Sequence, residues 1–134
     1  MRFAGYVGQA ELPAYLQASD IVALPSITTT RVKETWGLIM NEAMAAGTAV
    51  LATDAVGAAA GGLVVDGQTG LVVPEGDGAA LKRALERLLG NADERLSLAY
   101  AGQQHVRNWS FAAAADAFEA AITGAEPPAW AVAA

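Results

Sequence analysis

The fold is decided by residues 21–52, which read IVALPSITTTRVKETWGLIMNEAMAAGTAVLA. The stretch opens with a short apolar run, 21–24, and ends with another, 49–52. Each run is too short for a helix and is followed by Pro or Thr, which is typical of buried strands. Between them, a helical pattern over 36–46 ends at Gly47, a favourable helix terminus. Strand, helix and strand in this order indicate a βα unit on a parallel sheet.

The same alternation continues on both sides of this unit. Two more apolar runs, 3–7 and 70–73, bring the candidate strands to four. A short crossover helix over 11–16 is expected between the first two strands, with Pro13 in its first turn. Three successive helices are expected downstream: 77–90, 91–108 and one that begins after Ser110. The sequence therefore predicts an α/β fold with a parallel sheet and flanking helices.

Two segments lack a regular pattern. Residues 124–134 contain two prolines and are expected to form a frayed tail or to lie on the surface, where Trp130 can anchor them. Residues 54–62 are small apart from Asp54 and Val56. Such a stretch either lets the backbone approach a ligand closely or is a loop with no role.

The composition excludes several classes of function. The 134 residues carry 8 Lys and Arg against 14 Asp and Glu, and a net charge of −6 argues against a broad nucleic-acid or anionic-membrane surface. The absence of Cys excludes disulfides and thiol catalysis, and a single His, His105, excludes a multi-His metal site. We expect His105 and Tyr100 to be structural or surface residues. No apolar run reaches the roughly 18 to 20 residues of a membrane span, and no signal-peptide pattern is present, so we expect a soluble, cytoplasmic protein.

The candidate site follows the strand 21–24, because parallel sheets bind ligands beyond the carboxyl ends of their strands. Glu42 lies within the otherwise apolar helix 36–46. Burying an unpaired carboxylate is costly, so a hydrogen-bond donor is expected to meet it, and two vicinal sugar hydroxyls would do so. The alternative is that Glu42 bonds a neighbouring backbone group or reaches solvent.

A second carboxylate, Glu34, lies eight positions earlier, at the mouth of the same helix. A ligand that spans the helix start could contact both carboxylates. Gly37 and Leu38 in the first turn offer unpaired N–H groups and the positive end of the helix dipole, which together suit a phosphate. Arg31 and Lys33 either add local positive charge there or are merely solvated.

Residues 34–47, ETWGLIMNEAMAAG, resemble the E-x7-E block of retaining group 1 (family 4) glycosyltransferases of the GT-B fold. Further segments match the family in its own order: 3–7, 12–16, 18–26 and 66–74. The resemblance covers roughly residues 3–118. It implies a Rossmann-like, partial C-terminal donor-binding domain over 1–123, followed by a tail over 124–134.

The resemblance also implies roles for individual residues. The carboxylate of Glu34 would contact the donor sugar and act in catalysis, and that of Glu42 would hold the ribose of the nucleotide. The amides of Gly37 and Leu38 would bind the donor diphosphate. Thr69, with Gly70 and Leu71, would lie near the base or simply end a strand. The implied reaction is retaining transfer from a nucleoside-diphosphate sugar without a metal or other cofactor, and no acidic D-x-D pair suited to a metal occurs.

The sequence departs from the family in two ways. Gly62 stands where many members have a Glu. The resemblance also implies an N-terminal acceptor domain and two further strands that have no counterpart here, so we expect the chain alone to be inactive. Without those two strands, segments 3–7 and 21–24 are expected to pair directly or to leave edges that recruit a second copy as a homodimer.

Two functions other than glycosyl transfer are also compatible with this kind of domain. One is a non-catalytic nucleotide-binding or assembly fragment. The other is a dinucleotide-dependent oxidoreductase, which is disfavoured because residues 57–62 do not spell G-x-G-x-x-G.

Overall fold

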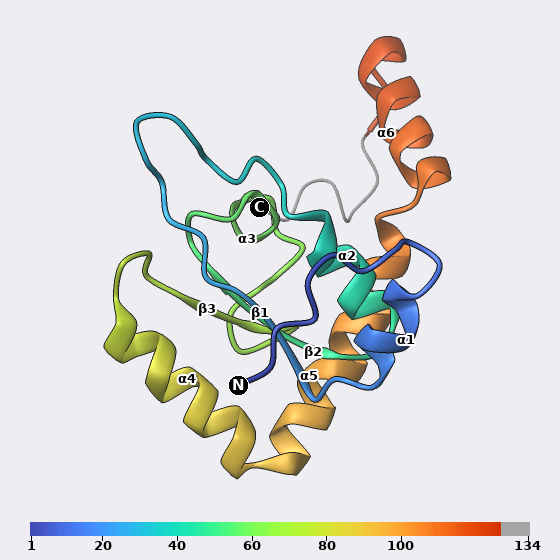
Figure 1. Ribbon diagram of the computed structural model, residues 1–134. Coiled ribbons are helices and arrows are strands. Elements are labelled where there is room, and N and C mark those ends of the chain that lie inside the picture. The colour runs from blue at the N-terminus through green and yellow to red at the C-terminus, as the bar shows by residue number, and fades with distance from the viewer. Residues whose placement is uncertain (127–134) are drawn as a thin grey trace.

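The computed structural model describes residues 1–126 and confirms the α/β fold. Its helices and strands alternate as far as β3 and are followed by helices only (Figure 1). The predicted role of Trp130 falls outside the described residues. The elements are α1 (Leu12–Gln17), β1 (Ile21–Leu24), α2 (Leu38–Ala45), β2 (Ala49–Thr53), α3 (Gly57–Ala60), β3 (Leu71–Val73), α4 (Gly78–Gly90), α5 (Ala92–His105), the 3-10 turn η1 (Val106–Asn108) and α6 (Phe111–Thr123).

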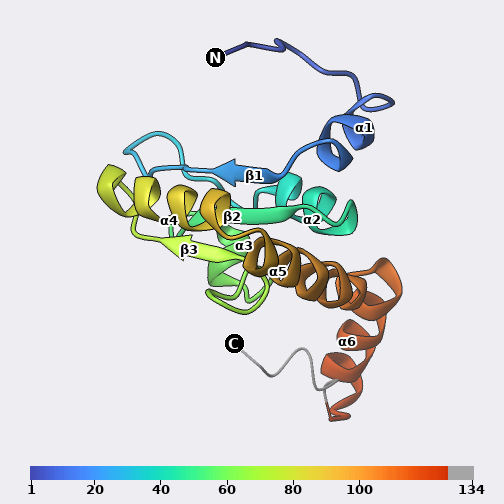
Figure 2. The ribbon, with the colours of Figure 1, turned by 90° about the horizontal axis from the view of Figure 1, so that it is seen from below.

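The sheet is parallel, with the strand order β1-β2-β3. Every residue of the central strand β2 is buried, because its alternating side chains serve two cores. Val50 and Ala52 pack with α1, α2 and α3 on one face. Leu51 packs with α4 and α5 on the other face. Helices therefore cover both faces of the sheet (Figure 2).

The loops that follow the three strands are joined at the carboxyl edge of the sheet. The Thr53 hydroxyl donates to the Ser26 carbonyl oxygen at 2.6 Å. The Glu75 N–H donates to Asp54 Oδ1 at 2.7 Å, and the Glu75 carboxylate accepts the N–H of Thr28. This edge is thus a connected surface rather than three separate loops.

The predicted strand over residues 3–7 is wrong. These residues form no strand, and Phe3 and Tyr6 are 86% and 94% exposed. Figure 2 shows the amino-terminal segment lying apart from the sheet. An apolar run becomes a strand only when a neighbouring strand accepts its hydrogen bonds and covers its side chains. The expected direct pairing with residues 21–24 does not occur, and within residues 1–126 β1 pairs with β2 alone.

Other predictions are confirmed or refined. Side chains cap α4, α5 and α6 as expected: Asp77, Asn91 and Ser110 each accept an N–H from the first turn of their helix. The helix predicted over 91–108 is divided into α5 and η1. Among residues 1–126, no helix is long and apolar enough to span a membrane.

Candidate functional site

The first half of the loop between β1 and α2 is held by a local turn. The N–H of Thr29 donates to the Val32 carbonyl oxygen, and Thr29 Oγ1 accepts the N–H of Val32, both at 2.9 Å. Arg31 and Lys33 lie in and beside this turn and are exposed. Their predicted role as local positive charge at the site stays a prediction.

The second half of the loop, residues 34–37, is called here the anchored segment because α3 holds its backbone. The N–H of Gly57 donates to the Glu34 carbonyl oxygen at 3.3 Å, and the N–H of Ala58 donates to the Trp36 carbonyl oxygen at 2.8 Å. These donors belong to the first turn of α3, where helical N–H groups have no partner within the helix. The anchored segment thus takes the place of a cap for α3.

The small residues within 54–62 make room for this contact. A Cβ atom on Gly57 would lie 1.8 Å from the Thr35 carbonyl oxygen, and one on Gly61 would lie 2.7 Å from the Trp36 ring. Both separations are shorter than any real carbon contact, so only glycine fits. The sequence analysis left two interpretations of this stretch, ligand approach or no role. The structure shows a third, in which the chain's own loop approaches it.

The indole of Trp36 is enclosed by groups from three places in the chain. Its Nε1–H donates to Asn41 Oδ1 on α2 at 2.7 Å. Its ring lies 5.0 Å from the ring of Trp109 between centroids, with 41° between the ring planes. Gly61 lies beside its third side. Trp36 is therefore the side chain that fixes the anchored segment from within.

Gly37 turns the chain into α2. Its φ of +85° is a left-handed conformation that favours glycine. A Cβ there would lie 2.7 Å from Leu24 Cδ2 and 2.9 Å from Val56 Cγ1. The same position lies 3.7 Å from the Cγ of Glu34, so the half-buried Glu34 side chain stands beside Gly37 at the helix start.

The amino terminus of α2 offers unbonded amides next to Glu34. The first hydrogen bond at this end runs from the Met40 N–H to the Gly37 carbonyl oxygen at 2.8 Å. The amide of Leu38 precedes this bond and has no acceptor within the helix. Because the helix dipole is positive at this end, an anion is stabilised there. The structure thus brings together three of the predicted site residues: Glu34, Gly37 and Leu38.

The prediction that Glu42 is buried is wrong, because Glu42 is exposed. Only one face of α2 packs against the sheet, and Met40, Ala43 and Met44 occupy it. Glu42 lies on the opposite face, one turn beyond Leu38, which is 70% exposed. The cost of burying a carboxylate therefore does not apply to Glu42, and the alternative that Glu42 reaches solvent is correct.

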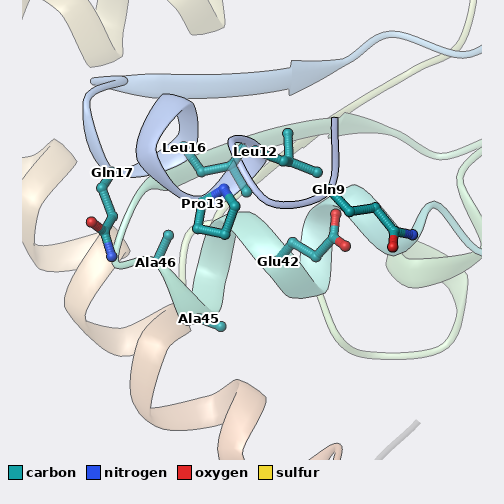
Figure 3. A pocket seen from close by; sticks show the side chains of 8 residues that line it. All are labelled: Gln9, Leu12, Pro13, Leu16, Gln17, Glu42, Ala45 and Ala46. Atoms are coloured by element: carbon teal, nitrogen blue, oxygen red, sulfur yellow. The ribbon is translucent and has the colours of Figure 1, made fainter. Parts of the chain in front are cut away.

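Glu42 borders two hollows, one on each side of α2. Figure 3 shows the first, of about 550 Å³, between α1 and α2, with Glu42 and Gln9 at the same end of it. The second, of about 450 Å³, extends to Gln103 and Arg107. Glu34 lines neither of them. The structure therefore does not place the two carboxylates in one shared hollow.

Thr69 lies away from these residues, just before β3 and so at the amino edge of the sheet. Its hydroxyl accepts the N–H of Val65 at 2.8 Å and donates to the Leu63 carbonyl oxygen at 3.0 Å. The side chain is buried. The hydroxyl of Thr69 is thus engaged within its own turn.

Two residues set aside in the sequence analysis have the expected structural or surface positions. His105 Nε2 lies 2.9 Å from the Gly62 carbonyl oxygen and joins α5 to the segment after α3. Tyr100 is 67% exposed. Among residues 1–126, no group of three or more His, Asp or Glu side chains is arranged to hold a metal ion.

Sequence reasoning missed the residues that support the site. Gly57 and Gly61 are spaced by one helical turn, and Trp36 is the one aromatic residue in the stretch 25–37. Two glycines one helical turn apart indicate that another segment packs closely on that turn, and a large aromatic side chain such as that of Trp36 is a candidate for the packed group. That signal was present in the sequence, although it did not identify Trp109 as the further partner.

Comparison with known proteins identifies the family. The family model described as "Glycosyl transferases group 1" matches residues 1–105. A D-inositol 3-phosphate glycosyltransferase of Corynebacterium aurimucosum is 41% identical over 122 residues, which cover 89% of this chain and 27% of that protein. A phosphatidyl-myo-inositol mannosyltransferase of Mycobacterium leprae is 37% identical, with 86% and 29% covered. The chain thus spans about a quarter of the length of these curated relatives.

Solved structures agree with this assignment. Sucrose-phosphate synthase from Thermosynechococcus elongatus has a TM-score of 0.69 and 31% identity, covering 79% of this chain and 25% of that one. The C-terminal domain of a group 1 glycosyl transferase from Francisella tularensis has a TM-score of 0.68 and 32% identity, with 79% and 51% covered. Anabaena HepE, solved in complex with UDP-glucose, has a TM-score of 0.65 and 25% identity, with 86% and 30% covered. This chain therefore belongs to the group 1 glycosyl transferases and has the fold of part of their GT-B C-terminal domain.

Proposed function

We propose that this chain is the donor-binding part of a retaining glycosyltransferase that uses a nucleoside-diphosphate sugar. The observation that carries the proposal is the helix start at Gly37, where free amides and the Glu34 carboxylate lie side by side at the carboxyl edge of a parallel sheet. An activated donor has this same pairing of groups, since an anionic diphosphate is joined directly to a polyhydroxylated sugar. The relative solved with UDP-glucose supports this ligand class.

The proposed contacts divide the donor along α2. The diphosphate accepts hydrogen bonds from the amides of Gly37 and Leu38, and the Glu34 carboxylate accepts hydrogen bonds from sugar hydroxyls. Glu42, on the outer face of the helix, accepts from the two ribose hydroxyls. The exposed side chains of Arg31 and Lys33 turn toward the phosphates when the donor binds. In this assignment the Thr69 hydroxyl stabilises its own turn, and other groups contact the nucleotide base.

We further propose that transfer needs an acceptor domain supplied by other polypeptide, and that the isolated chain is inactive. A glycosyl donor and its acceptor must be held together in a cleft from which water is excluded. The residues described here form one wall of such a cleft, and the chain spans about a quarter of its relatives' length. Sugar transfer by the completed protein supports this proposal, whereas a non-catalytic nucleotide-binding module would show no transfer.

The turnover experiment compares the chain alone with a fusion to the amino-terminal part of a curated relative. With radiolabelled UDP-glucose, the fusion should transfer sugar and the chain alone should not. The anomeric configuration of the product, read by NMR, tests retention. Activity that survives a chelator supports the proposal that no metal or other cofactor is needed, and loss of activity contradicts it. Fractionation of the source cells tests the proposed cytoplasmic location.

The unpaired edge of β1 supports a proposed homodimer. Within residues 1–126, β1 has one strand neighbour, β2, so one row of its backbone groups is unpaired with any strand. Such an edge can pair with the same edge of a second copy. Sedimentation velocity should then show a mass that rises with concentration. A monomer mass at every concentration contradicts the dimer without affecting the donor site.

Donor binding is tested first with the chain as it stands. UDP, ADP and GDP are titrated into ¹⁵N-labelled chain, and the amide signals of Gly37 and Leu38 are expected to shift. Glu42→Gln should weaken the nucleotide that binds by roughly tenfold, since a charge-assisted hydrogen bond is replaced by a neutral one. Glu119→Gln, an exposed change on α6, is the matched control and should bind normally. Unshifted signals at Gly37 and Leu38 with all three nucleotides would overturn the donor site.

A further inference from the structure

We propose that Trp109 is a positioning residue for the donor site, which it controls by fixing Trp36 and thereby the anchored segment, residues 34–37. The inference rests on the proposed function, because the anchored segment carries the Glu34 carboxylate and the Gly37 amide assigned to the donor and leads directly into the Leu38 amide. Trp109 lies between η1 and α6, beyond residues 1–105 that match the family model. The route proposed for its effect on the site is its ring contact with Trp36.

The ring contact between the two tryptophans supplies one side of the enclosure of Trp36. The centroids are 5.0 Å apart with the planes tilted by 41°, a favourable arrangement for two aromatic rings. The other sides come from Asn41 and Gly61, which belong to the packed body of the domain. Of the groups around Trp36 named here, Trp109 is the one that belongs to the carboxyl-terminal helical region.

An apolar hollow lies where the side chains of Trp36 and Trp109 meet. Trp36, Leu38 and Trp109 all line a hollow of about 480 Å³ at the start of α6. Truncation of Trp109 enlarges this hollow directly against the Trp36 indole. The indole then has room to leave its rotamer, and its backbone carbonyl, which accepts the N–H of Ala58 at 2.8 Å, moves with it.

The position of Trp109 is itself braced. Its backbone N–H donates to the Val106 carbonyl oxygen at 2.9 Å, and its Nε1–H lies 3.4 Å from His105 Nε2. The same His105 nitrogen lies 2.9 Å from the Gly62 carbonyl oxygen, just after α3. Because one ring nitrogen cannot donate to Gly62 and accept from Trp109 together, the long Trp109 hydrogen bond is the weaker of the two. The Trp109→Phe variant therefore tests the aromatic contact separately from the indole N–H.

This arrangement joins the carboxyl-terminal helix to the donor site. The helix α6 begins two residues after Trp109, at Phe111, and leaves the body of the domain (Figures 1 and 2). Trp109 is thus the point at which a displacement of α6 would be transmitted to Trp36. Through the contact between Trp36 and Trp109, the donor site depends on a residue that lies outside the motif of residues 34–47.

The test uses three variants of this chain. Trp109→Ala removes the ring, Trp109→Phe keeps an aromatic ring but removes the indole N–H, and Tyr100→Ala is the control that removes an exposed aromatic from α5. The first readout is hydrogen exchange at the Ala58 amide, which is bonded to the Trp36 carbonyl, compared with the amides of β2. The second readout is the dissociation constant for UDP.

Trp109→Ala should speed exchange at Ala58 by roughly tenfold relative to β2, and should weaken UDP binding by about threefold to tenfold. Trp109→Phe should restore both values, and Tyr100→Ala should change neither. Exchange at Ala58 that rises only in step with β2 would show a general loss of stability and overturn the inference. If the unaltered chain does not bind UDP, the proposed UDP donor fails by itself, while the exchange comparison still decides whether Trp109 positions the anchored segment.

Discussion

At Gly57, the backbone of α3 and the backbone of the anchored segment meet with no space for a side chain. An added methyl group would lie 1.8 Å from the Thr35 carbonyl oxygen and 2.6 Å from its carbonyl carbon. Both of these atoms belong to the backbone, so rotation of a side chain cannot relieve the overlap. This single residue therefore determines how closely α3 can hold the candidate site.

Gly57→Ala should lower the free energy of unfolding by about 1–3 kcal/mol, the usual cost of overpacking, and should also weaken UDP binding. Gly78→Ala is the matched control. Gly78 lies in α4 with nothing within 4 Å of the added methyl, so its replacement should be neutral or stabilising by up to about 1 kcal/mol. Urea unfolding of both variants measures the difference. Equal stabilities would show that α3 moves aside without cost.

Glu42 shows where reasoning from single residues failed. The helix around it is confirmed, but its many apolar residues led to the prediction that Glu42 is buried as well. In the structure, α2 buries Met40 and Met44 and exposes Leu38 together with Glu42. The exposed apolar residue made the outer face of the helix resemble a core face in sequence. The sequence could identify the carboxylate but could not determine which face it occupies.

At the scale of elements, an ion pair joins α4 to α5. The guanidinium of Arg87 donates to the Glu94 carboxylate from both Nε and Nη2, and Glu94 lies in the first turn of α5. These hydrogen bonds and the nearby positive charge hold the pKa of Glu94 below its ordinary value of 4.5. The same carboxylate raises the pKa of Arg87.

Glu94→Gln should remove part of the acid sensitivity of the fold. Because the pKa of Glu94 is lowered in the folded state, its contribution is fully present above pH 4.5 and is lost as the pH falls through the lowered folded-state pKa. The variant should therefore be less stable than the unaltered chain at pH 7, and the difference should shrink as the solution is acidified. Thermal unfolding between pH 7 and pH 3 measures it. A stability difference between the two chains that does not change with pH would contradict a contribution from the lowered pKa of Glu94.

The elements that could be predicted are those whose signals are local. The caps Asp77, Asn91 and Ser110 fix the starts of three helices through hydrogen bonds within a single turn. The strand over 3–7 failed because a strand depends on a neighbour that its own residues do not specify. The helix α3 was missed for a related reason, since its Gly and Ala residues are selected by the loop that packs on them.

At the scale of the whole molecule, large apolar side chains are exposed at both ends of the described chain. Phe3 and Tyr6 precede α1, and Phe111, Phe118 and Ile122 lie along α6. Exposed apolar side chains mark an interaction surface where they gather into one patch. This exposure agrees with a chain that spans about a quarter of its relatives' length.

Deletion of residues 1–6 should change the free energy of unfolding by no more than about 0.5 kcal/mol, because all six are exposed. Gly8 is kept, since its carbonyl oxygen accepts the N–H groups of Glu11 and Leu12 at the start of α1. Urea unfolding compares the shortened and complete chains. A larger loss would mean that the segment packs against the domain in solution.

The backbone hydrogen bonds from α3 to residues 34–37 have a consequence for affinity. Ordering a residue costs about 1–2 kcal/mol of conformational entropy, and this loop incurs that cost when the protein folds. If the proposed donor binds at the start of α2, it meets backbone that is already ordered, so less of its binding energy is spent on ordering this loop. Few contacts would then suffice for a flexible, highly charged molecule.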